Sequence, residues 1–132
     1  MADLLSFDTT FLIDLQKERL ANRKGGANQF LQRHQGSLMA LSCVALGEFA
    51  EGFKDRNDPT FEQIVAAVQI LEVDLETSWL YGQNARRLRR TGKLVGSNDL
   101  WIGCCAVRYN TPLVTRYGAH FRRIEGLEVL GY

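Results

Sequence analysis

The feature that most constrains the fold is the alternation of short apolar runs with longer segments of helical character. Leu4–Phe7 is a nearly continuous apolar run, which is typical of a strand buried on both faces of a parallel sheet. Further strand candidates are Leu38–Leu41, Pro112–Thr115 and Leu127–Leu130, with Val73–Leu75 as a shorter one. Strands that alternate with helices need right-handed crossovers, and these favour a mainly parallel sheet. The sequence therefore predicts an α/β fold with helices on both faces of the sheet.

Helix signals lie between these apolar runs. Asp8, Ser42 and Asn98 are residue types that cap helices, and each stands before a segment with a helical pattern. Gly36 and Gly92 stand where helices commonly stop. The predicted helices run from Phe11 to Leu20, Asn28 to Gln35, Ser42 to about Phe53, Thr60 to Leu71, Glu76 to Arg90 and Asn98 to about Tyr109.

Composition limits the classes of protein to be considered. With 132 residues, the chain has room for one domain, which we place at 1–132. The formal charge of +1 provides no overall attraction for nucleic acid, so phosphate affinity must come from a local cluster or a bound metal. No apolar stretch has the roughly 18 residues of a membrane span, and the early Asp3 argues against a signal peptide, which predicts a cytoplasmic protein without a membrane partner. Cys43, Cys104 and Cys105 form no CxxC pair and lie in apolar runs, so we expect buried, reduced thiols.

Three acidic residues stand in settings where a carboxylate is costly without a role. Asp8 follows an apolar strand, Glu48 lies in an apolar helix, and Asp99 begins another one. The strand-to-helix junction at Asp8 is where open α/β sheets usually bind ligands. Carboxylates brought together repel one another unless a cation neutralises them, and hard oxygen ligands select Mg²⁺ or Mn²⁺. Such ions activate water and stabilise the leaving oxygen in phosphodiester hydrolysis.

Each acid also has a purely structural interpretation. Asp8 can serve as a helix cap, Asp99 can stabilise the first turn of its helix, and Glu48 can be a half-exposed helix residue. Glu51, one turn beyond Glu48, is a candidate for an additional carboxylate, although a solvent-facing role is the simpler interpretation. The residues alone leave these alternatives open.

Several ordered segments resemble the PIN-domain ribonucleases of the VapC toxin type. Phe7–Ile13 resembles the family's first strand and first acid, Ser42–Gly52 its second-acid helix, and Gly92–Gly103 its third-acid segment. Leu113–Arg116 and His120–Leu127 resemble the closing region, so the likeness covers essentially the whole chain. It implies a PIN-like three-layer sandwich and an Mg²⁺- or Mn²⁺-dependent endoribonuclease, with Asp8, Glu48 and Asp99 as catalytic and metal-binding residues. It also implies a homodimer that a VapB-type antitoxin inhibits within a higher hetero-oligomer.

One position departs from the family's pattern. Many members carry a fourth Asp, or an Asn, where this sequence has Tyr117. A tyrosine is a poor Mg²⁺ ligand, although it can orient a water or stack on a base. A three-acid site with one firmly held ion is therefore the cautious model, and the hydroxyls of Thr9 and Thr115 are candidates for holding metal-bound water.

Candidate RNA-binding residues come from a basic run and one isolated arginine. The run ends the helix before the third-acid segment, where the helix dipole alone would favour cations. We expect some of its side chains to hold RNA phosphates, and Arg116 is a comparable candidate. His34 and His120 lie outside the acid motifs, so we expect structural roles for both. The candidates in the run are Arg86, Arg87, Arg90 and Lys93.

Two other functions were compared with the ribonuclease. A catalytically impaired PIN-like module that binds RNA or a partner is the main alternative, because Tyr117 replaces the fourth acid. A phospho-accepting signalling domain is disfavoured, since the sequence lacks the acidic pair before Asp8 and the late strand-end lysine that such a domain needs. The RNA target is not determined by the sequence, because every RNA presents the same phosphodiester.

Overall fold

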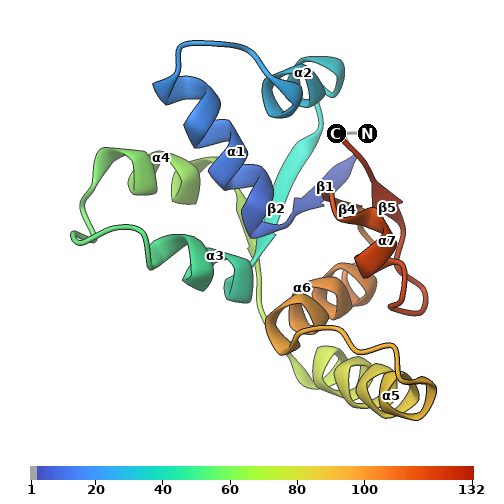
Figure 1. The fold of residues 1–132 in the computed structure, drawn as a ribbon. Helices are drawn as coiled ribbons and strands as arrows, with labels where there is room; N and C mark the ends of the chain where they lie inside the picture. Colours follow the sequence, from blue (N-terminus) through green and yellow to red (C-terminus); the bar gives the residue numbers. More distant parts are fainter. Residues whose placement is uncertain (1–2) are drawn as a thin grey trace.

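The computed structural model describes residues 3–132 and contains a five-stranded sheet in the order β3-β2-β1-β4-β5 (Figure 1). Each pair of neighbouring strands is parallel, and β1, the first strand in the chain, lies at the centre. The predicted α/β fold with a mainly parallel sheet is thus confirmed. The strands are β1 (Leu4–Phe7), β2 (Leu38–Ser42), β3 (Gln69–Leu71), β4 (Leu113–Val114) and β5 (Val129–Leu130).

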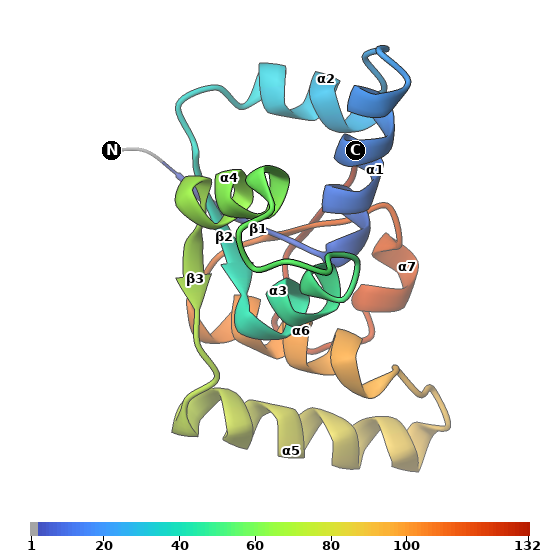
Figure 2. The ribbon, with the colours of Figure 1, turned by 90° about the vertical axis from the view of Figure 1, so that its left-hand side faces the viewer.

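The helices form layers on both sides of this sheet, as predicted. In Figures 1 and 2, α1 and α2 lie on one side of the strands and α6 lies on the opposite side, with α5 packed against the outer face of α6. None of the helices in residues 3–132 is long and apolar enough to cross a membrane. The helices are α1 (Thr9–Leu20), α2 (Gly26–Arg33), α3 (Cys43–Ala50), α4 (Pro59–Ala67), α5 (Leu75–Thr91), α6 (Ser97–Arg108) and α7 (Gly118–Phe121).

Local capping explains where several helices begin and end. The side chains of Asp8, Ser42 and Asp74 accept hydrogen bonds from backbone N–H groups in the first turns of α1, α3 and α5. The long helix α5 ends at Gly92, which has φ +70° in the left-handed region that glycine adopts without strain. The capping roles predicted for Asp8 and Ser42, and the stop at Gly92, are confirmed.

The buried carboxylate of Glu18 fixes the loop between α1 and α2. Its Oε1 accepts hydrogen bonds from the backbone N–H of Gly25 (2.8 Å), the backbone N–H of Asn28 (3.1 Å) and the Asn28 side-chain amide (2.8 Å). Its Oε2 accepts one from the backbone N–H of Ala27 at 3.0 Å. Burial alone would raise the pKa of Glu18, but these four hydrogen bonds outweigh it and hold the pKa below its usual value. Glu18 therefore stabilises the turn into α2 as an ionised carboxylate.

Close packing of α6 against the C-terminal segment depends on a glycine. Gly103 is buried, and a Cβ atom at this position would overlap the Ile124 side chain. The apolar core beneath it combines residues from both helical layers with the sheet, and it includes Phe7, Phe11 and Phe121. The core thereby holds α6, which carries Asp99, directly against the strands.

Three details of the predicted elements are wrong. The predicted strand Val73–Leu75 is absent; β3 lies at Gln69–Leu71, where it pairs with β2, and α4 ends at Ala67 instead of reaching Leu71. The apolar pattern did not separate these two elements, because a short apolar run fits the end of a helix as well as a strand. Leu75 instead opens α5 behind the cap Asp74.

Asn98 and Cys43 also differ from expectation. Gly96 is the N-cap of α6, which starts at Ser97, so Asn98 lies inside the first turn. Its side chain does not cap the helix but donates a hydrogen bond to Glu48. Cys43 is exposed, whereas Cys104 and Cys105 are buried as predicted. Cys43 is the first residue of α3, and its neighbouring apolar residues did not reveal that its own position on the helix faces solvent.

Candidate active site

The carboxylate of Asp8 lies at the carboxyl end of the central strand β1 and is only 2% exposed. Its Oδ1 accepts the backbone N–H of Phe11 at 3.0 Å, which is the cap of α1. Its Oδ2 accepts a 2.6 Å hydrogen bond from the hydroxyl of Thr115, directly after β4. Because β1 and β4 are parallel neighbours, their carboxyl ends meet and hold the Asp8 side chain from two directions.

Glu48 approaches the same edge from α3, the helix that follows β2. Its Oε1 accepts a 2.6 Å hydrogen bond from the Thr9 hydroxyl, one residue beyond Asp8. Its Oε2 accepts a 3.3 Å hydrogen bond from the side-chain amide of Asn98. Glu48 therefore connects the start of α1 to the start of α6, which carries Asp99.

Asp99 is partly buried and bonded to a histidine. Its Oδ2 lies 3.1 Å from Nε2 of His120, a residue of the short helix α7. His120 was assigned no role at the site from the sequence, yet the structure places it in direct contact with one of the three acids. Asn98 was likewise expected only to cap α6. Neither contact has a local sequence signal, because both arise where distant segments meet.

The three acids influence one another electrostatically. Burial raises the pKa of Asp8, hydrogen bonds from Thr115 and Phe11 oppose this rise, and the negative charges of Asp99 and Asp14 add to it. Burial also raises the pKa of Asp99, with His120 opposing the rise and the charge of Glu48 adding to it. The negative charge of Asp99 thus repels that of Asp8, and the charge of Glu48 repels that of Asp99. A cation relieves such repulsion.

The acids at this edge and the two threonine hydroxyls beside them suit a hard cation in chemical type. They offer carboxylate and hydroxyl oxygens, which Mg²⁺ and Mn²⁺ prefer as ligands. Within residues 3–132, however, no three His, Cys, Asp or Glu side chains are close enough to surround one ion. Thr115, Thr9 and His120 each bond one carboxylate instead. Holding one ion between the acids would require the carboxylates to come closer together than they lie in this structure.

A further carboxylate lies near Asp8 but has its own partners. Asp14, on α1, accepts a 2.6 Å hydrogen bond from the Tyr132 hydroxyl and lies 3.3 Å from Nη1 of Arg116. No sequence pattern predicts that Asp14 lies near the site. Arg116, a predicted RNA-binding residue, is therefore partly engaged by an acid, and that contact neutralises Asp14 rather than leaving it available to a cation.

Tyr117, at the position where the family often has a fourth acid, is 49% exposed and follows β4. Its backbone N–H donates to the Thr115 hydroxyl at 3.0 Å, which orients that hydroxyl toward Asp8. Its ring centroid lies 5.3 Å from the Arg116 guanidinium carbon. The backbone of Tyr117 thus supports the Asp8 contact, while its ring faces the surface.

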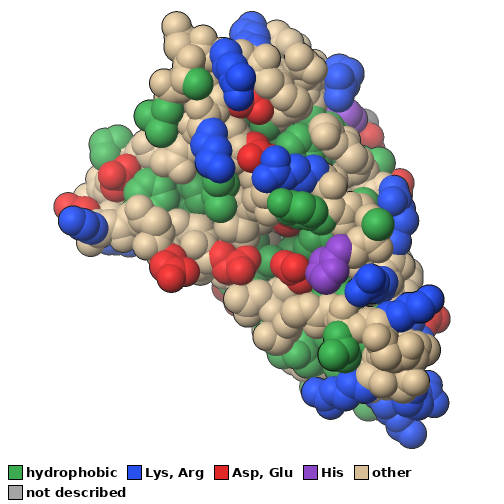
Figure 3. All heavy atoms as spheres, in the orientation of Figure 1, with side chains coloured by type: hydrophobic (Ala, Val, Ile, Leu, Met, Phe, Trp, Pro, Cys, Tyr) green, Lys and Arg blue, Asp and Glu red, His purple; other side chains and the backbone are tan. Residues whose placement is uncertain are grey.

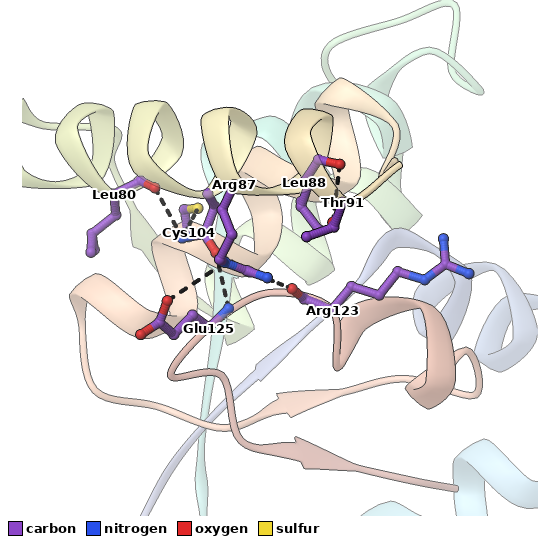
Figure 4. A network of polar contacts seen from close by, with 8 residues as sticks. Leu80, Arg87, Leu88, Thr91, Cys104, Arg123 and Glu125 are labelled. Atoms are coloured by element: carbon purple, nitrogen blue, oxygen red, sulfur yellow. Dashed lines mark hydrogen bonds and ion pairs between the residues drawn. The ribbon is translucent and has the colours of Figure 1, made fainter. Parts of the chain in front are cut away.

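Acidic and basic side chains adjoin on the face that carries this site. Figure 3 shows a row of acidic side chains across the face, with a histidine next to the row and several basic side chains beyond it. Among the predicted RNA-binding residues, Arg86, Arg90 and Lys93 are exposed. Arg87 is half-buried, and its Nη2 donates to the Asn84 side chain at 2.9 Å and to the Arg123 carbonyl at 2.6 Å (Figure 4). Arg87 thus has a structural role, whether or not RNA also reaches it.

The fold and the site together define a class: a parallel α/β domain with acidic side chains gathered at the carboxyl ends of its central strands. The chain belongs to the PIN domain family, whose profile matches residues 6–127. The family resemblance seen in the sequence motifs is therefore confirmed.

Individual relatives share most of the chain. Ribonuclease VapC1 of Haemophilus influenzae (strain R2866) is 29% identical over 129 residues, which cover 92% of each chain. Ribonuclease VapC1 of Methanocaldococcus jannaschii is also 29% identical, over 125 residues that cover 92% of this chain and 83% of that protein.

Solved structures show the same fold. VapBC2 from Rickettsia felis, in a complex with a DNA fragment from its promoter, contains a chain that matches with a TM-score of 0.81 and 21% identity over 98% of both chains. DNA-bound VapBC from Salmonella typhimurium matches with a TM-score of 0.78 and 22% identity over 99% of this chain and 98% of that one. The PIN-like α/β fold is thereby confirmed.

Proposed function

We propose that this protein is a divalent-metal-dependent endoribonuclease, with Asp8, Glu48 and Asp99 as the residues that hold Mg²⁺ or Mn²⁺. The observation that carries this proposal is that three acids from separate segments meet at one edge of the sheet, where Glu48 bonds both Thr9, next to Asp8, and Asn98, next to Asp99. The name Ribonuclease VapC, given to relatives that span most of the chain, supports RNA as the substrate. An ion held there would supply Lewis acidity that activates water and stabilises the leaving oxygen.

The surrounding side chains keep these acids in position. Thr115 and the backbone of Phe11 fix both oxygens of Asp8, and Thr9 and Asn98 fix those of Glu48. We infer that His120 is a positioning residue, because its ring bonds the Asp99 carboxylate. We retain Thr9 and Thr115 as supporting residues that can orient water beside the acids, and Tyr117 as one that can orient water or stack on a base.

The proposed biological setting is a toxin and antitoxin pair. Several structural neighbours are VapBC complexes, and this supports a VapB-type protein as the inhibitor of this chain. We expect a homodimer that forms a larger hetero-oligomer with the antitoxin. Light scattering of the protein alone and after co-expression with the antitoxin would measure both states.

The test is RNA cleavage by the purified, antitoxin-free protein. Structured and single-stranded RNAs are incubated with Mg²⁺, with Mn²⁺ or with EDTA, and products are resolved on a denaturing gel. Wild-type protein is expected to cut at least one RNA in either metal and none in EDTA. Asp8→Asn and Asp99→Asn are expected to abolish cutting, because each removes a charged oxygen ligand.

Asp3→Asn is the matched control. Asp3 is exposed and precedes β1, at the opposite end of the strand from Asp8, so the same chemical change is made away from the site. Full cleavage by both Asp8→Asn and Asp99→Asn would contradict the ribonuclease assignment. Metal binding measured by calorimetry, without cleavage of any RNA, would instead favour the alternative of a catalytically impaired module that binds RNA or a partner.

A further inference from the structure

A basic hollow lies beside the acidic site, between the end of α5 and the segment that contains α7. It has a volume of about 460 Å³ and is lined by Arg87, Leu88, Lys93, Ala119, Arg122 and Arg123. Lys93, Arg122 and Arg123 are exposed. The hollow therefore combines space for a small anionic group with four cationic side chains.

The walls of this hollow are fixed by hydrogen bonds between α5 and the turn after α7 (Figure 4). The buried Asn84 accepts from Arg87 Nη2 at 2.9 Å and from the backbone N–H of Glu125 at 2.9 Å. Arg87 Nη2 also donates to the carbonyl of Arg123 at 2.6 Å. These contacts do not depend on a ligand, so the two segments that carry the basic side chains are already side by side before anything binds, which lowers the cost of binding.

The charges in the hollow are only partly neutralised. Arg87 Nε lies 3.5 Å from the carboxylate of Glu125, which accounts for one cation. Arg123 Nη1 donates to the carbonyl of Leu94, a neutral group, so its positive charge remains. Neither Lys93 nor Arg122 forms an ion pair within residues 3–132. Three positive charges are thus available to an anion.

The hollow and the proposed active site are linked by α7. Ala119 lines the hollow, and the next residue, His120, bonds Asp99. The Arg122 guanidinium lies against Gly118, where a Cβ atom would come within 2.8 Å of Arg122 Nη1. Because Gly118 has no side chain, the Arg122 side chain can pack along α7, the helix that carries His120.

We propose that this hollow binds a backbone phosphate of the RNA substrate, next to the phosphate that is cut, through Lys93, Arg122 and Arg123. The inference rests on the proposed ribonuclease function and extends it by assigning RNA positioning to a set of residues of which only Lys93 was a sequence candidate. Arginine and lysine are the side chains that contact phosphates most often, and such contacts position nucleic acid without reading its sequence. Arg87 supports the hollow from within the protein.

The test measures the salt dependence of RNA binding. The parent protein carries Asp8→Asn to prevent cutting, and the probe is a short, fluorescently labelled single-stranded RNA followed by anisotropy over a range of NaCl concentrations. Each phosphate of a single strand that the protein neutralises contributes about 0.7 to the slope of log affinity against log salt. Because the hollow holds one phosphate, Lys93→Gln with Arg122→Gln is expected to lower the slope by about 0.7, equally for two RNAs of unrelated sequence. Lys93→Gln alone should lower it by less.

The control pair is Lys17→Gln with Arg33→Gln, on α1 and α2. Both residues are exposed, and the pair removes the same total charge, so a slope close to that of the parent is expected. The pair Arg86→Gln with Arg90→Gln removes two charges of the basic run that do not line the hollow, and it therefore tests whether the hollow matters more than the rest of the run. If that pair or the control pair lowers the slope as much as the hollow pair does, the hollow is not a specific phosphate site.

Two further arms separate this proposal from its rivals. If the hollow pair loses affinity for a poly-glutamate peptide while RNA binding is unchanged, the hollow is a site for an acidic protein segment and the proposal is wrong. Cleavage by protein with Asp8 intact is measured in parallel. Unchanged salt slopes with active cleavage would overturn the hollow alone, whereas lowered slopes without any cleavage would overturn the nuclease and leave the hollow as an RNA-binding site.

Discussion

Replacement of Glu18 by glutamine should destabilise the protein, although the side chain keeps its size. Glu18 is 8% exposed and accepts four hydrogen bonds at the turn between α1 and α2. A glutamine can keep its carbonyl where Oε1 now meets Gly25 and Asn28. The NH₂ group of the glutamine would then face the backbone N–H of Ala27, donor against donor. The remaining hydrogen bonds would be accepted by a neutral oxygen instead of a carboxylate. A lost charge-assisted hydrogen bond together with an unsatisfied buried donor costs about 2 to 4 kcal/mol.

Thermal unfolding followed by circular dichroism measures this loss. For a chain of this size, each kcal/mol lowers Tm by roughly 3 to 5 °C, so a decrease of about 6 to 20 °C is expected at pH 7. Glu128→Gln is the control, because Glu128 is exposed and its side chain forms no hydrogen bond or ion pair within residues 3–132. A Glu18→Gln variant that melts within 2 °C of wild type, roughly 0.5 kcal/mol, would refute the reasoning.

The same variant carries a pH prediction. The pKa of Glu18 is lower in the folded protein than in the unfolded chain, where it is about 4.3. The stability that its ionised form contributes is therefore complete above the unfolded value and is lost as the pH falls through the folded value. The difference in Tm between wild type and Glu18→Gln should be constant from pH 7 to pH 5 and should shrink below about pH 4. A difference that grows on acidification would reverse the assigned direction of the pKa shift.

Two further predictions concern glycine and cysteine. Gly92→Ala should lower the free energy of unfolding by about 1 kcal/mol, because Gly92 has φ +70°. Gly82→Ala, in the exposed middle of α5, should raise it by about 0.5 to 1 kcal/mol. Urea unfolding of both variants would measure the contrast. Burial raises the pKa of Cys104 to about 12 and of Cys105 to about 11, so iodoacetamide at pH 8 should label only the exposed Cys43 in the native protein and all three thiols after unfolding. Rapid labelling of Cys104 in the native state would contradict its burial.

Local sequence was enough to predict the element around Asp8. The apolar run Leu4–Phe7 and the caps that follow it specify a strand, a turn and a helix within a few residues, and the structure has all three. The parallel sheet followed from the spacing of such units. Glu48 was expected inside a helix and Asp99 at the start of another, and the structure has them in α3 and in the first turn of α6.

The partners of the acids could not be predicted in the same way. His120 lies 21 residues after Asp99, and Asn98 lies 50 residues after Glu48, so each contact depends on how whole layers pack. Strand β3 was missed for a related reason. Gln69–Leu71 fits the end of the preceding helix as well as a strand, and its pairing with β2 is what makes it a strand. Tertiary context decided these positions, and no single-sequence pattern reports it.

The central place of β1 has a consequence for how the site forms during synthesis. A ribosome adds about 5 to 20 residues per second, and β1 emerges first with only β2 available to pair with it. Its second neighbour, β4, and the hydroxyl that holds Asp8 follow 107 residues later. A growing chain can therefore carry Asp8, Glu48 and Asp99 while Asp8 still lacks the strand and the threonine that hold it in place. The ordered acidic site is formed only after Thr115 has been made, so the unfinished protein is not expected to possess it.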